Sequence, residues 1–337
     1  MKRIAILGGG SWGTALAIVL ARTPKVHRIT LWVRDAALAE SIRRDRENKL
    51  YLPGHKLPEA TQVTHNAAFA VQNTVVVIGA IPSAHAREVY RRILPHIVRG
   101  TPILSATKGL EPATHSRMSE VIAQISKEVL PDELPRIAVL SGPSFAAEAA
   151  AGQPTAVVLA SKDVALANEL QEEFAAPNFR LYTNDDILGV ELAGAMKNVI
   201  AIAAGACQGL GLGSNPMAAL VTRGLAEMTR LAVALGARQE TLSGLAGLGD
   251  LVLTCTGSLS RNRYVGIELG KGRSLSEILE GMKMVAEGVG TAGALLALAR
   301  EAGVELPITE QVSAILNEGK SPQEAIRSIM ERPLKRE

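Results

Sequence analysis

The sequence predicts an α/β protein in which an N-terminal domain with a mostly parallel sheet is followed by an all-α domain. Short apolar runs alternate with helical stretches over the first half of the chain, which is the pattern of a parallel sheet with crossover helices. From Ile187 onward, helical patterns follow one another with few candidate strands. The 337 residues suffice for two domains. We place the domains at residues 1–185 and 186–337.

The opening of the chain joins a strand, a glycine turn and a helix. Ile4–Leu7 is a short apolar run, three glycines follow at Gly8, Gly10 and Gly13, and Thr14–Ala21 has a helical composition. This order is typical of a Rossmann-type dinucleotide-binding unit. The first glycine permits the tight turn, the second admits a pyrophosphate to the backbone, and the third lets the helix pack against the sheet. The free N–H groups of the helix start favour phosphate binding.

The other strands of this domain follow at regular intervals. Apolar runs typical of buried parallel strands occupy residues 28–33, 74–80, 102–106, 137–140, 155–160 and 179–182. With helices between them, they predict a sheet of about eight strands. In the second domain, Asp185 and Asp186 are expected to cap its long first helix. Ser274 with Glu277, and Ser321 with Glu324, have the spacing of capping boxes.

Arg34 and Asp35 follow the second strand, where dinucleotide-binding folds read the ribose of the cofactor. An acidic residue at this place binds the ribose hydroxyls of NAD, whereas an arginine accommodates the 2′-phosphate of NADP. Because Arg34 comes first, we expect NADP(H) to be accepted. The alternative is that Arg34 is an ordinary surface residue.

Charge and composition exclude several classes of function. Lys and Arg number 36 against 33 Asp and Glu, a formal net charge of +3, and no basic run suggests nucleic-acid binding. The two cysteines, Cys207 and Cys255, have no metal-ligand spacing and are expected to be free thiols in a reducing compartment. We expect no metal site, no membrane span and a cytoplasmic protein.

Lys197 is the candidate general acid/base. It lies in the apolar stretch 191–204, and no other Asp, Glu, Lys or Arg occurs between it and Arg223. A helix that is apolar nearly all round is buried. Desolvation, or a neighbouring cation such as Lys108, lowers the pKa of a lysine towards the range that proton transfer needs. The alternative is a solvated surface lysine.

Further candidates lie near strand ends and in glycine-rich turns. Lys108 follows the carboxyl end of the strand over 102–106, where ligands bind in open α/β sheets. Asp250 is a charge in an apolar setting and needs a partner, for which Lys197 is a candidate, although it could instead cap a helix. Residues 260–262, Ser-Arg-Asn, have the chemistry of an anion site, or of a solvated basic turn.

Eight segments together carry a family resemblance that covers nearly the whole chain. They are GGGSWGTA (8–15), YLPG (51–54), TKGLE (107–111), SGPSFA (141–146), ELAGAMKN (191–198), GLGDL (247–251), SRN (260–262) and VAEG (285–288). With these segments the chain resembles the bacterial NAD(P)-dependent sn-glycerol-3-phosphate dehydrogenases. One departure is Gly9, where that family commonly has alanine, and we expect little consequence.

The resemblance implies roles for individual residues. Lys197 would be the proton donor/acceptor, with Lys108 and Asp250 also in the catalytic group. The implied substrate contacts are Lys108, Gly142, Ser144, Lys197, Asp250, Thr254, Ser260, Arg261 and Asn262. The implied cofactor contacts are Ser11, Trp12, Arg34, Lys108, Ala146, Arg261, Val285 and Glu287, beside Gly8, Gly10 and Gly13.

The implied reaction is the reduction of dihydroxyacetone phosphate to sn-glycerol 3-phosphate by NADPH or NADH, which supplies glycerophospholipid synthesis. Two other interpretations stay open. The 6-phosphogluconate and 3-hydroxyacid dehydrogenases also join a Rossmann domain to a helical one with a lysine base. The second interpretation is a regulator that binds NAD(P) as a sensor and has no enzymatic turnover. Such a regulator would not require a buried lysine or a separate anion site. We expect a homodimer, because homodimers are the commonest oligomers among soluble proteins.

Overall fold

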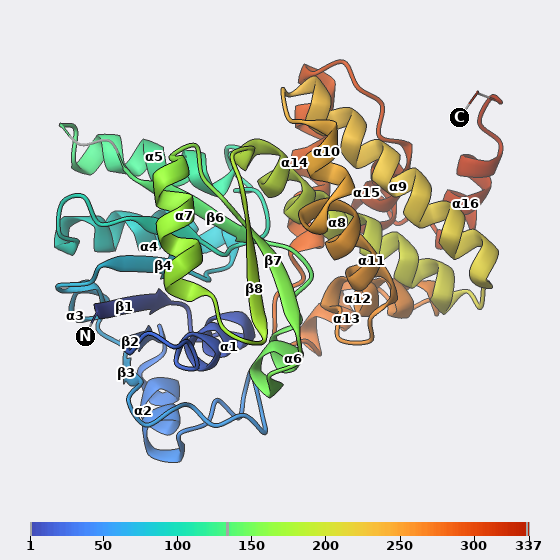
Figure 1. Cartoon of the computed structure of the whole chain (residues 1–337). Helices are drawn as coiled ribbons and strands as arrows, with labels where there is room; N and C mark the ends of the chain where they lie inside the picture. Colours follow the sequence, from blue (N-terminus) through green and yellow to red (C-terminus); the bar gives the residue numbers. More distant parts are fainter. Residues whose placement is uncertain (1, 133–134, 335, 337) are drawn as a thin grey trace. The chain divides into compact units, whose positions relative to one another are not determined.

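The computed structural model describes residues 2–132, 135–334 and 336. The chain forms two compact units (Figure 1). The first comprises the residues up to 111 together with 116–191, and the second comprises 112–115 and the residues from 192 onward. The division therefore falls inside the long helix α8, Ile187–Gly209, whereas the change in composition comes a few residues earlier, at Asp185.

An eight-stranded sheet forms the centre of the first unit. Its strands are β1 (Lys2–Leu7), β2 (His27–Trp32), β3 (Gln62–Thr64), β4 (Val76–Gly79), β5 (Ile103–Ser105), β6 (Ile137–Ser141), β7 (Thr155–Ala160) and β8 (Phe179–Asn184). They lie in the order β3-β2-β1-β4-β5-β6-β7-β8, and every neighbouring pair is parallel except β6–β7. This confirms the predicted mostly parallel sheet. The short edge strand β3 was not predicted, because three residues with one buried side chain leave no apolar run to recognise.

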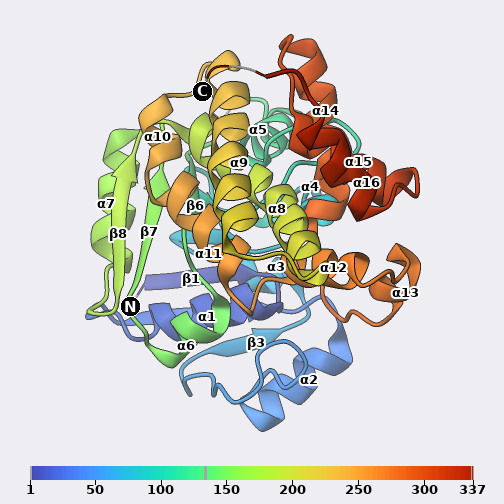
Figure 2. The same cartoon turned by 90° about the vertical axis from the view of Figure 1, so that its right-hand side faces the viewer.

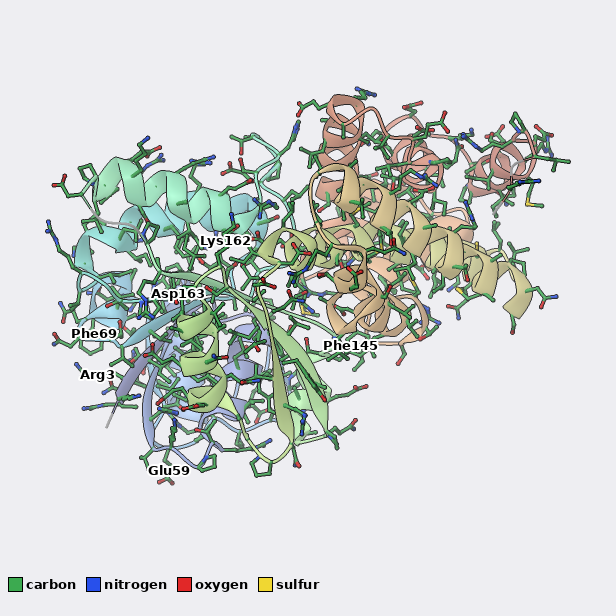
Figure 3. All side chains as sticks on the ribbon, turned by 45° about the horizontal axis from the view of Figure 1, so that its top comes forward. Arg3, Glu59, Phe69, Phe145, Lys162 and Asp163 are labelled. Atoms are coloured by element: carbon green, nitrogen blue, oxygen red, sulfur yellow. The ribbon has the colours of Figure 1, made fainter. Side chains whose placement is uncertain are left out.

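Helices cover both faces of this sheet (Figures 1 and 2). They are α1 (Ser11–Leu20), α2 (Ala36–Asp45), α3 (Ala67–Val71), α4 (Ser83–Ile93), the 3₁₀ turn η1 (Leu94–His96), α5 (Met118–Val129), α6 (Ala146–Ala151) and α7 (Val164–Phe174). Ile4 and Ile6 of β1 pack with α1, α2, α6 and α7, whereas Ala5 and Leu7 pack with α3, α4 and α5. Each face of the sheet thus has its own apolar core, as the pleat requires. Asp163 caps α7 by accepting a 3.0 Å hydrogen bond from Leu166 N (Figure 3).

The first helix begins earlier than the sequence suggests. α1 starts at Ser11, with Gly10 as its N-cap in an extended conformation, rather than at Thr14. The N–H of Thr14 already bonds to the carbonyl of Gly10 at 3.0 Å. Glycine is tolerated in a first turn where packing demands it, so Gly13 lies within the helix and Ser11 and Trp12 open it.

The regular secondary structure of the second unit, in the residues that the structure describes, is all helical. After α8 come α9 (Ser214–Ala234), α10 (Gln239–Ser243), a π-helical turn η2 (Leu245–Gly249), α11 (Asp250–Thr256), α12 (Arg261–Gly270), α13 (Leu275–Glu280), α14 (Glu287–Glu301), α15 (Pro307–Asn317) and α16 (Pro322–Met330). Both predicted capping boxes are present, at Ser274 with Glu277 and at Ser321 with Glu324. Asp186 caps α8 through Gly189 N at 2.8 Å.

α8 is anchored at its start and buried along its length. Glu191 accepts hydrogen bonds from Ser119 N at 2.8 Å, Ser119 Oγ at 2.5 Å and Arg117 Nη1 at 2.7 Å, at the beginning of α5. Among the described residues, α8 is the one helix long and apolar enough to cross a membrane, yet 89% of its most apolar window is buried inside the protein. Core helices of soluble proteins have the same property.

Candidate active site

The glycine loop between β1 and α1 requires two of its glycines sterically. Gly8 has φ +120°, and a Cβ there would lie 2.3 Å from the carbonyl oxygen of Ala80. A Cβ on Gly13 would lie 1.9 Å from the carbonyl oxygen of Gly8. These contacts confirm the tight turn and the close packing of the helix. Around Gly10 there is open space, with no atom within 4 Å of a Cβ position.

The buried side chain of Asn48, from a distant part of the sequence, forms hydrogen bonds that hold the glycine loop. Its Nδ2 donates to the carbonyl of Gly9 at 2.8 Å and to Thr14 Oγ1 at 2.9 Å. Sequence reasoning did not identify this residue, because an isolated Asn in a polar loop carries no signal. A Cβ on Gly9 would lie 2.7 Å from a methyl group of Val33, so alanine at this place requires Val33 to shift.

The loop fits a dinucleotide. The N–H groups at the start of α1, with their partial positive charge, and the open space at Gly10 suit a pyrophosphate. The indole Nε1 of Trp12 is buried and has no acceptor among the described residues, so it can donate to a bound ligand.

Arg34 lies beyond the end of β2, next to the N-cap of α2. Its side chain is exposed. Asp35 Oδ1 accepts a 2.6 Å hydrogen bond from Leu38 N, and this bond ties the carboxylate to α2. Arg34 is therefore an exposed cation at the place where dinucleotide-binding folds read the ribose of the cofactor.

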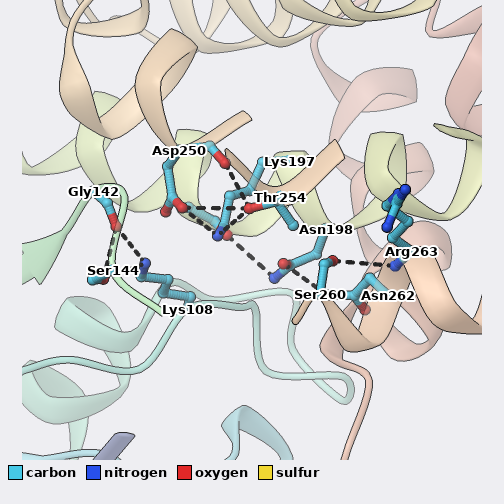
Figure 4. A network of polar contacts seen from close by, with 11 residues as sticks. Lys108, Gly142, Ser144, Lys197, Asn198, Asp250, Thr254, Ser260, Asn262 and Arg263 are labelled. Atoms are coloured by element: carbon cyan, nitrogen blue, oxygen red, sulfur yellow. Dashed lines mark hydrogen bonds and ion pairs between the residues drawn. The ribbon is translucent and has the colours of Figure 1, made fainter. Parts of the chain in front are cut away.

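Lys108 belongs to a polar cluster of the first unit (Figure 4). Its Nζ donates to the carbonyl of Gly142 at 2.8 Å and to Ser144 Oγ at 3.3 Å. Ser144 Oγ also donates to the Gly142 carbonyl, at 2.9 Å. Gly142 has φ +126°, a backbone conformation that favours glycine. Three residues that the family resemblance assigns to substrate binding are therefore in mutual contact. Ala146 begins the helix α6 that follows.

Lys197 and Asp250 form a buried ion pair in the second unit (Figure 4). Lys197 Nζ donates to Asp250 Oδ1 at 2.7 Å and to Thr254 Oγ1 at 2.9 Å. The exposed fractions of the Lys197 and Asp250 side chains are 7% and 1%. Thr254 Oγ1 in turn donates to the backbone oxygen of Asp250 at 2.5 Å. The sequence predicted both the burial of Lys197 and its partner.

The charges of this pair act on the neighbouring thiol of Cys255. Burial raises the pKa of Cys255 to about 12, against the opposing effect of Lys197 and Arg263. A thiol with this pKa is protonated at neutral pH and is therefore a poor nucleophile. Lys197 is thus the proton-transfer candidate of this cluster.

Residues 260–262 open α12. Ser260 is its N-cap and accepts a 3.2 Å hydrogen bond from Arg263 N through Oγ. Arg261 is the first helical residue and is exposed. The predicted helix start, with its partial positive charge, is therefore present.

The side-chain amide of Asn262 already forms two hydrogen bonds within the protein. Its Oδ1 accepts from Gly288 N at 2.9 Å, and its Nδ2 donates to Asn198 Oδ1 at 2.9 Å. One amide hydrogen is left for a ligand. Asn198, next to Lys197 on α8, was not singled out by sequence reasoning. The one indication in the sequence was that Asn198 is a polar residue within a mostly apolar helix.

Glu287, the first residue of α14, lies near this helix start, and its negative charge acts on the guanidinium of Arg261. Val285, two residues earlier, is exposed. Across residues 2–132, 135–334 and 336, no group of three His, Cys, Asp or Glu side chains is placed to hold a metal ion.

Comparisons with known proteins assign the chain to a family. The profile described as NAD-dependent glycerol-3-phosphate dehydrogenase N-terminus matches residues 3–167, and the corresponding C-terminus profile matches residues 186–327. The chain is 54% identical over 334 residues to a glycerol-3-phosphate dehydrogenase [NAD(P)+] of Koribacter versatilis, covering 99% of this chain and 98% of that one. It is 56% identical over 337 residues to the protein of the same name from Acidobacterium capsulatum, covering 99% of both.

A crystal structure of glycerol-3-phosphate dehydrogenase from Coxiella burnetii has the same fold. It superposes with a TM-score of 0.92 at 42% identity, over 98% of this chain and 99% of that one. The resemblance seen in the sequence is thereby confirmed, together with the predicted fold class and the NAD(P) cofactor class. The chain belongs to the NAD(P)-dependent glycerol-3-phosphate dehydrogenase family of oxidoreductases.

Proposed function

We propose that this chain reduces dihydroxyacetone phosphate to sn-glycerol 3-phosphate with NADPH or NADH, and that Lys197 donates the proton. The observation that carries the proposal is the buried Lys197–Asp250 pair, with its 2.7 Å contact. Burying a charged side chain costs desolvation free energy, which a paired charge offsets only in part. A buried lysine in this apolar helix therefore favours a functional role. Proton donation to a developing alkoxide is such a role in a carbonyl reductase.

The proposed reaction adds one hydride and one proton to the carbonyl group of the substrate. Bound NAD(P)H supplies the hydride that reduces the carbonyl carbon. Lys197 Nζ gives its proton to the carbonyl oxygen, which becomes the hydroxyl of the product, and the neutral amine is then reprotonated from solvent. Asp250 and Thr254 hold Nζ in place and stabilise its charge before the transfer.

The substrate phosphate is assigned to the start of α12. Arg261 supplies a charged fork of donors, and the backbone N–H groups of the first turn add partial positive charge. Ser260 and Asn262 complete this site, although Asn262 has a single free amide hydrogen and therefore contributes less than Arg261. Lys108, Gly142 and Ser144 are assigned to the remainder of the substrate, with Lys108 adding positive charge near the reacting oxygen.

The cofactor is assigned chiefly to the first domain, residues 1–185. Gly8, Gly10 and Gly13, with Ser11 and Trp12, would hold the dinucleotide. Arg34 would bind the 2′-phosphate of NADP. The other proposed cofactor contacts are Lys108, Ala146, Arg261, Val285 and Glu287. The second domain, residues 186–337, would carry the substrate phosphate and the proton donor.

In the cell, we place the enzyme in the cytoplasm as a homodimer that supplies glycerol 3-phosphate for phospholipid synthesis. Size-exclusion chromatography with light scattering tests the dimer. A mass of one chain at micromolar concentration would refute it.

The direct test of the activity is spectrophotometric. Oxidation of NADPH or NADH is followed at 340 nm with dihydroxyacetone phosphate as substrate. 6-Phosphogluconate and a 3-hydroxyacid, each with the oxidised cofactor, serve as comparison substrates. We expect turnover with dihydroxyacetone phosphate at least about a hundredfold more efficient. The 3-hydroxyacid has no phosphate to form the charged hydrogen bonds of the proposed phosphate site, and 6-phosphogluconate carries a carboxylate and three more carbons than the three-carbon substrate. Binding of NADPH without turnover of any of these substrates would favour the regulator instead.

A further inference from the structure

The turn before Asp250 has an unusual backbone. η2 is a π-helical turn, closed by a 3.1 Å hydrogen bond from Gly249 N to the carbonyl of Gly244. A π turn holds one residue more than an α turn, and such turns occur frequently at functional sites. α11 begins immediately after it, with Asp250 as its first residue.

Gly247 lets this turn lie directly on the backbone of α10. A Cβ on Gly247 would lie 1.9 Å from the carbonyl oxygen of Leu242, 2.5 Å from its carbonyl carbon and 2.6 Å from its Cα. Gly247 and Leu242 are both buried. The obstructing atoms belong to a helix backbone and cannot turn aside as a flexible side chain can. Any residue other than glycine must therefore push the π turn away from α10.

A shift of this turn reaches Asp250, which lies three residues further on. The hydrogen bond from Lys197 to Asp250 is 2.7 Å long, and N–H···O hydrogen bonds in proteins span about 2.7–3.2 Å and weaken steeply when they are bent. Both side chains are buried, so water cannot readily fill a gap between them. A displacement of about 1 Å therefore takes the two atoms out of hydrogen-bond range, and misplacements of this size can cost about a hundredfold in rate.

We propose that Gly247 is a positioning residue for proton transfer: its missing side chain allows the π turn to set the Asp250 carboxylate against Lys197. The inference rests on the proposed function and adds a determinant of it that touches neither substrate nor cofactor. It follows that Gly247 acts on the rate only through Asp250.

The same turn contains a matched control. A Cβ on Gly244 would lie 3.5 Å from its nearest neighbour, the carbonyl oxygen of Thr241, which is an ordinary contact. The backbone of Gly244 is extended, with φ −88° and ψ −164°, and accepts alanine without strain. Gly244→Ala and Gly247→Ala thus add the same methyl group to one turn, with and without a backbone clash.

A double-mutant cycle tests the proposal. The turnover number for dihydroxyacetone phosphate is measured in the wild type, Gly247→Ala, Asp250→Asn and the double variant, with Gly244→Ala beside them. We expect Gly247→Ala to lower kcat by about ten- to a hundredfold, which is part of the usual worth of acid/base assistance. Gly244→Ala stays within about twofold of the wild type, and each variant keeps its affinity for NADPH.

The decisive result is the coupling. In the Asp250→Asn background, Gly247→Ala should cost less than about threefold, because the ion pair that it disturbs is already lost. Equal losses in both backgrounds would overturn the proposal, as would a Gly247→Ala enzyme with wild-type kcat. Inactivity of the wild type itself with dihydroxyacetone phosphate would instead refute the proposed function.

A second variant covers the case in which Gly247→Ala melts below the assay temperature. Leu248 is 38% exposed. Its deletion removes the extra residue of the π turn without adding atoms, and each residue removed from a helix rotates the remainder of that helix by about 100°. We expect the deletion to lower kcat as far as Asp250→Asn does, whereas Leu248→Ala, which keeps the turn, stays near the wild type. A deletion variant with full activity would contradict the positioning role.

Discussion

Glu227 of α9 accepts a 2.6 Å hydrogen bond from the backbone N–H of Ile308, in the first turn of α15. Its other oxygen is 3.3 Å from both Thr309 N and Thr309 Oγ1. A buried carboxylate from one helix thus caps another helix, in place of a local N-cap side chain. Burial raises the pKa of Glu227 to about 7, against these hydrogen bonds.

The stability of the protein should therefore depend on pH through Glu227. The folded protein holds this proton up to about pH 7, whereas the unfolded chain releases it near 4.5. The free energy of unfolding contributed by Glu227 falls as pH rises between these values, by up to about 3 kcal/mol in total. Glu227→Gln keeps an acceptor for Ile308 but does not titrate. Urea unfolding of both proteins from pH 5 to 8 should show the free energy of unfolding of the wild type falling, relative to that of Glu227→Gln, as pH rises. Parallel curves would contradict the raised pKa.

Arg34 should decide how well NADPH is used relative to NADH. Arg34→Ala removes the guanidinium assigned to the 2′-phosphate, and charged hydrogen bonds are worth about 1.5–3 kcal/mol. We expect the KM for NADPH to rise by about ten- to a hundredfold, and that for NADH to change little. Arg28→Ala is the matched control, since Arg28 is an exposed arginine of β2, the strand that precedes Arg34. Equal effects of Arg34→Ala on both cofactors would exclude the role.

Arg261 should read the phosphate of the substrate. Arg261→Ala is expected to weaken dihydroxyacetone phosphate binding by about ten- to a hundredfold, for the same energetic reason. The preference over unphosphorylated dihydroxyacetone should narrow by a similar factor. Lys271→Ala, which removes a positive charge just after the other end of α12, should leave both substrates unaffected. An unchanged preference in Arg261→Ala would show that another group binds the phosphate.

The sequence predicted the features that arise from local pattern or from an isolated charge. The strand, glycine turn and helix at the N-terminus were recognisable because their spacing is set within a few residues. Lys197 and Asp250 were predicted as partners because a charge in an apolar segment needs an opposite charge.

Features set by contacts between distant segments could not be predicted in this way. Asn48 holds the glycine loop from 34 residues beyond Thr14, and nothing near Asn48 in the sequence indicates this. The engagement of Asn262 by Asn198 and Gly288 likewise depends on how three helices meet. The π turn was invisible for a similar reason, because glycines in a loop do not reveal which backbone they touch.

The kcat of Lys197→Met with dihydroxyacetone phosphate and NADPH tests most directly whether Lys197 donates the proton. Methionine keeps the length and apolar stem of the side chain and removes the ammonium group. We predict a folded protein with near-normal NADPH affinity, a kcat lower by about 10²–10⁴-fold, and loss of the decline in kcat that the wild type should show at alkaline pH. Lys271→Met, at an exposed site, should behave as the wild type. A folded Lys197→Met protein within about threefold of wild-type kcat would contradict the account and return Lys197 to a structural role.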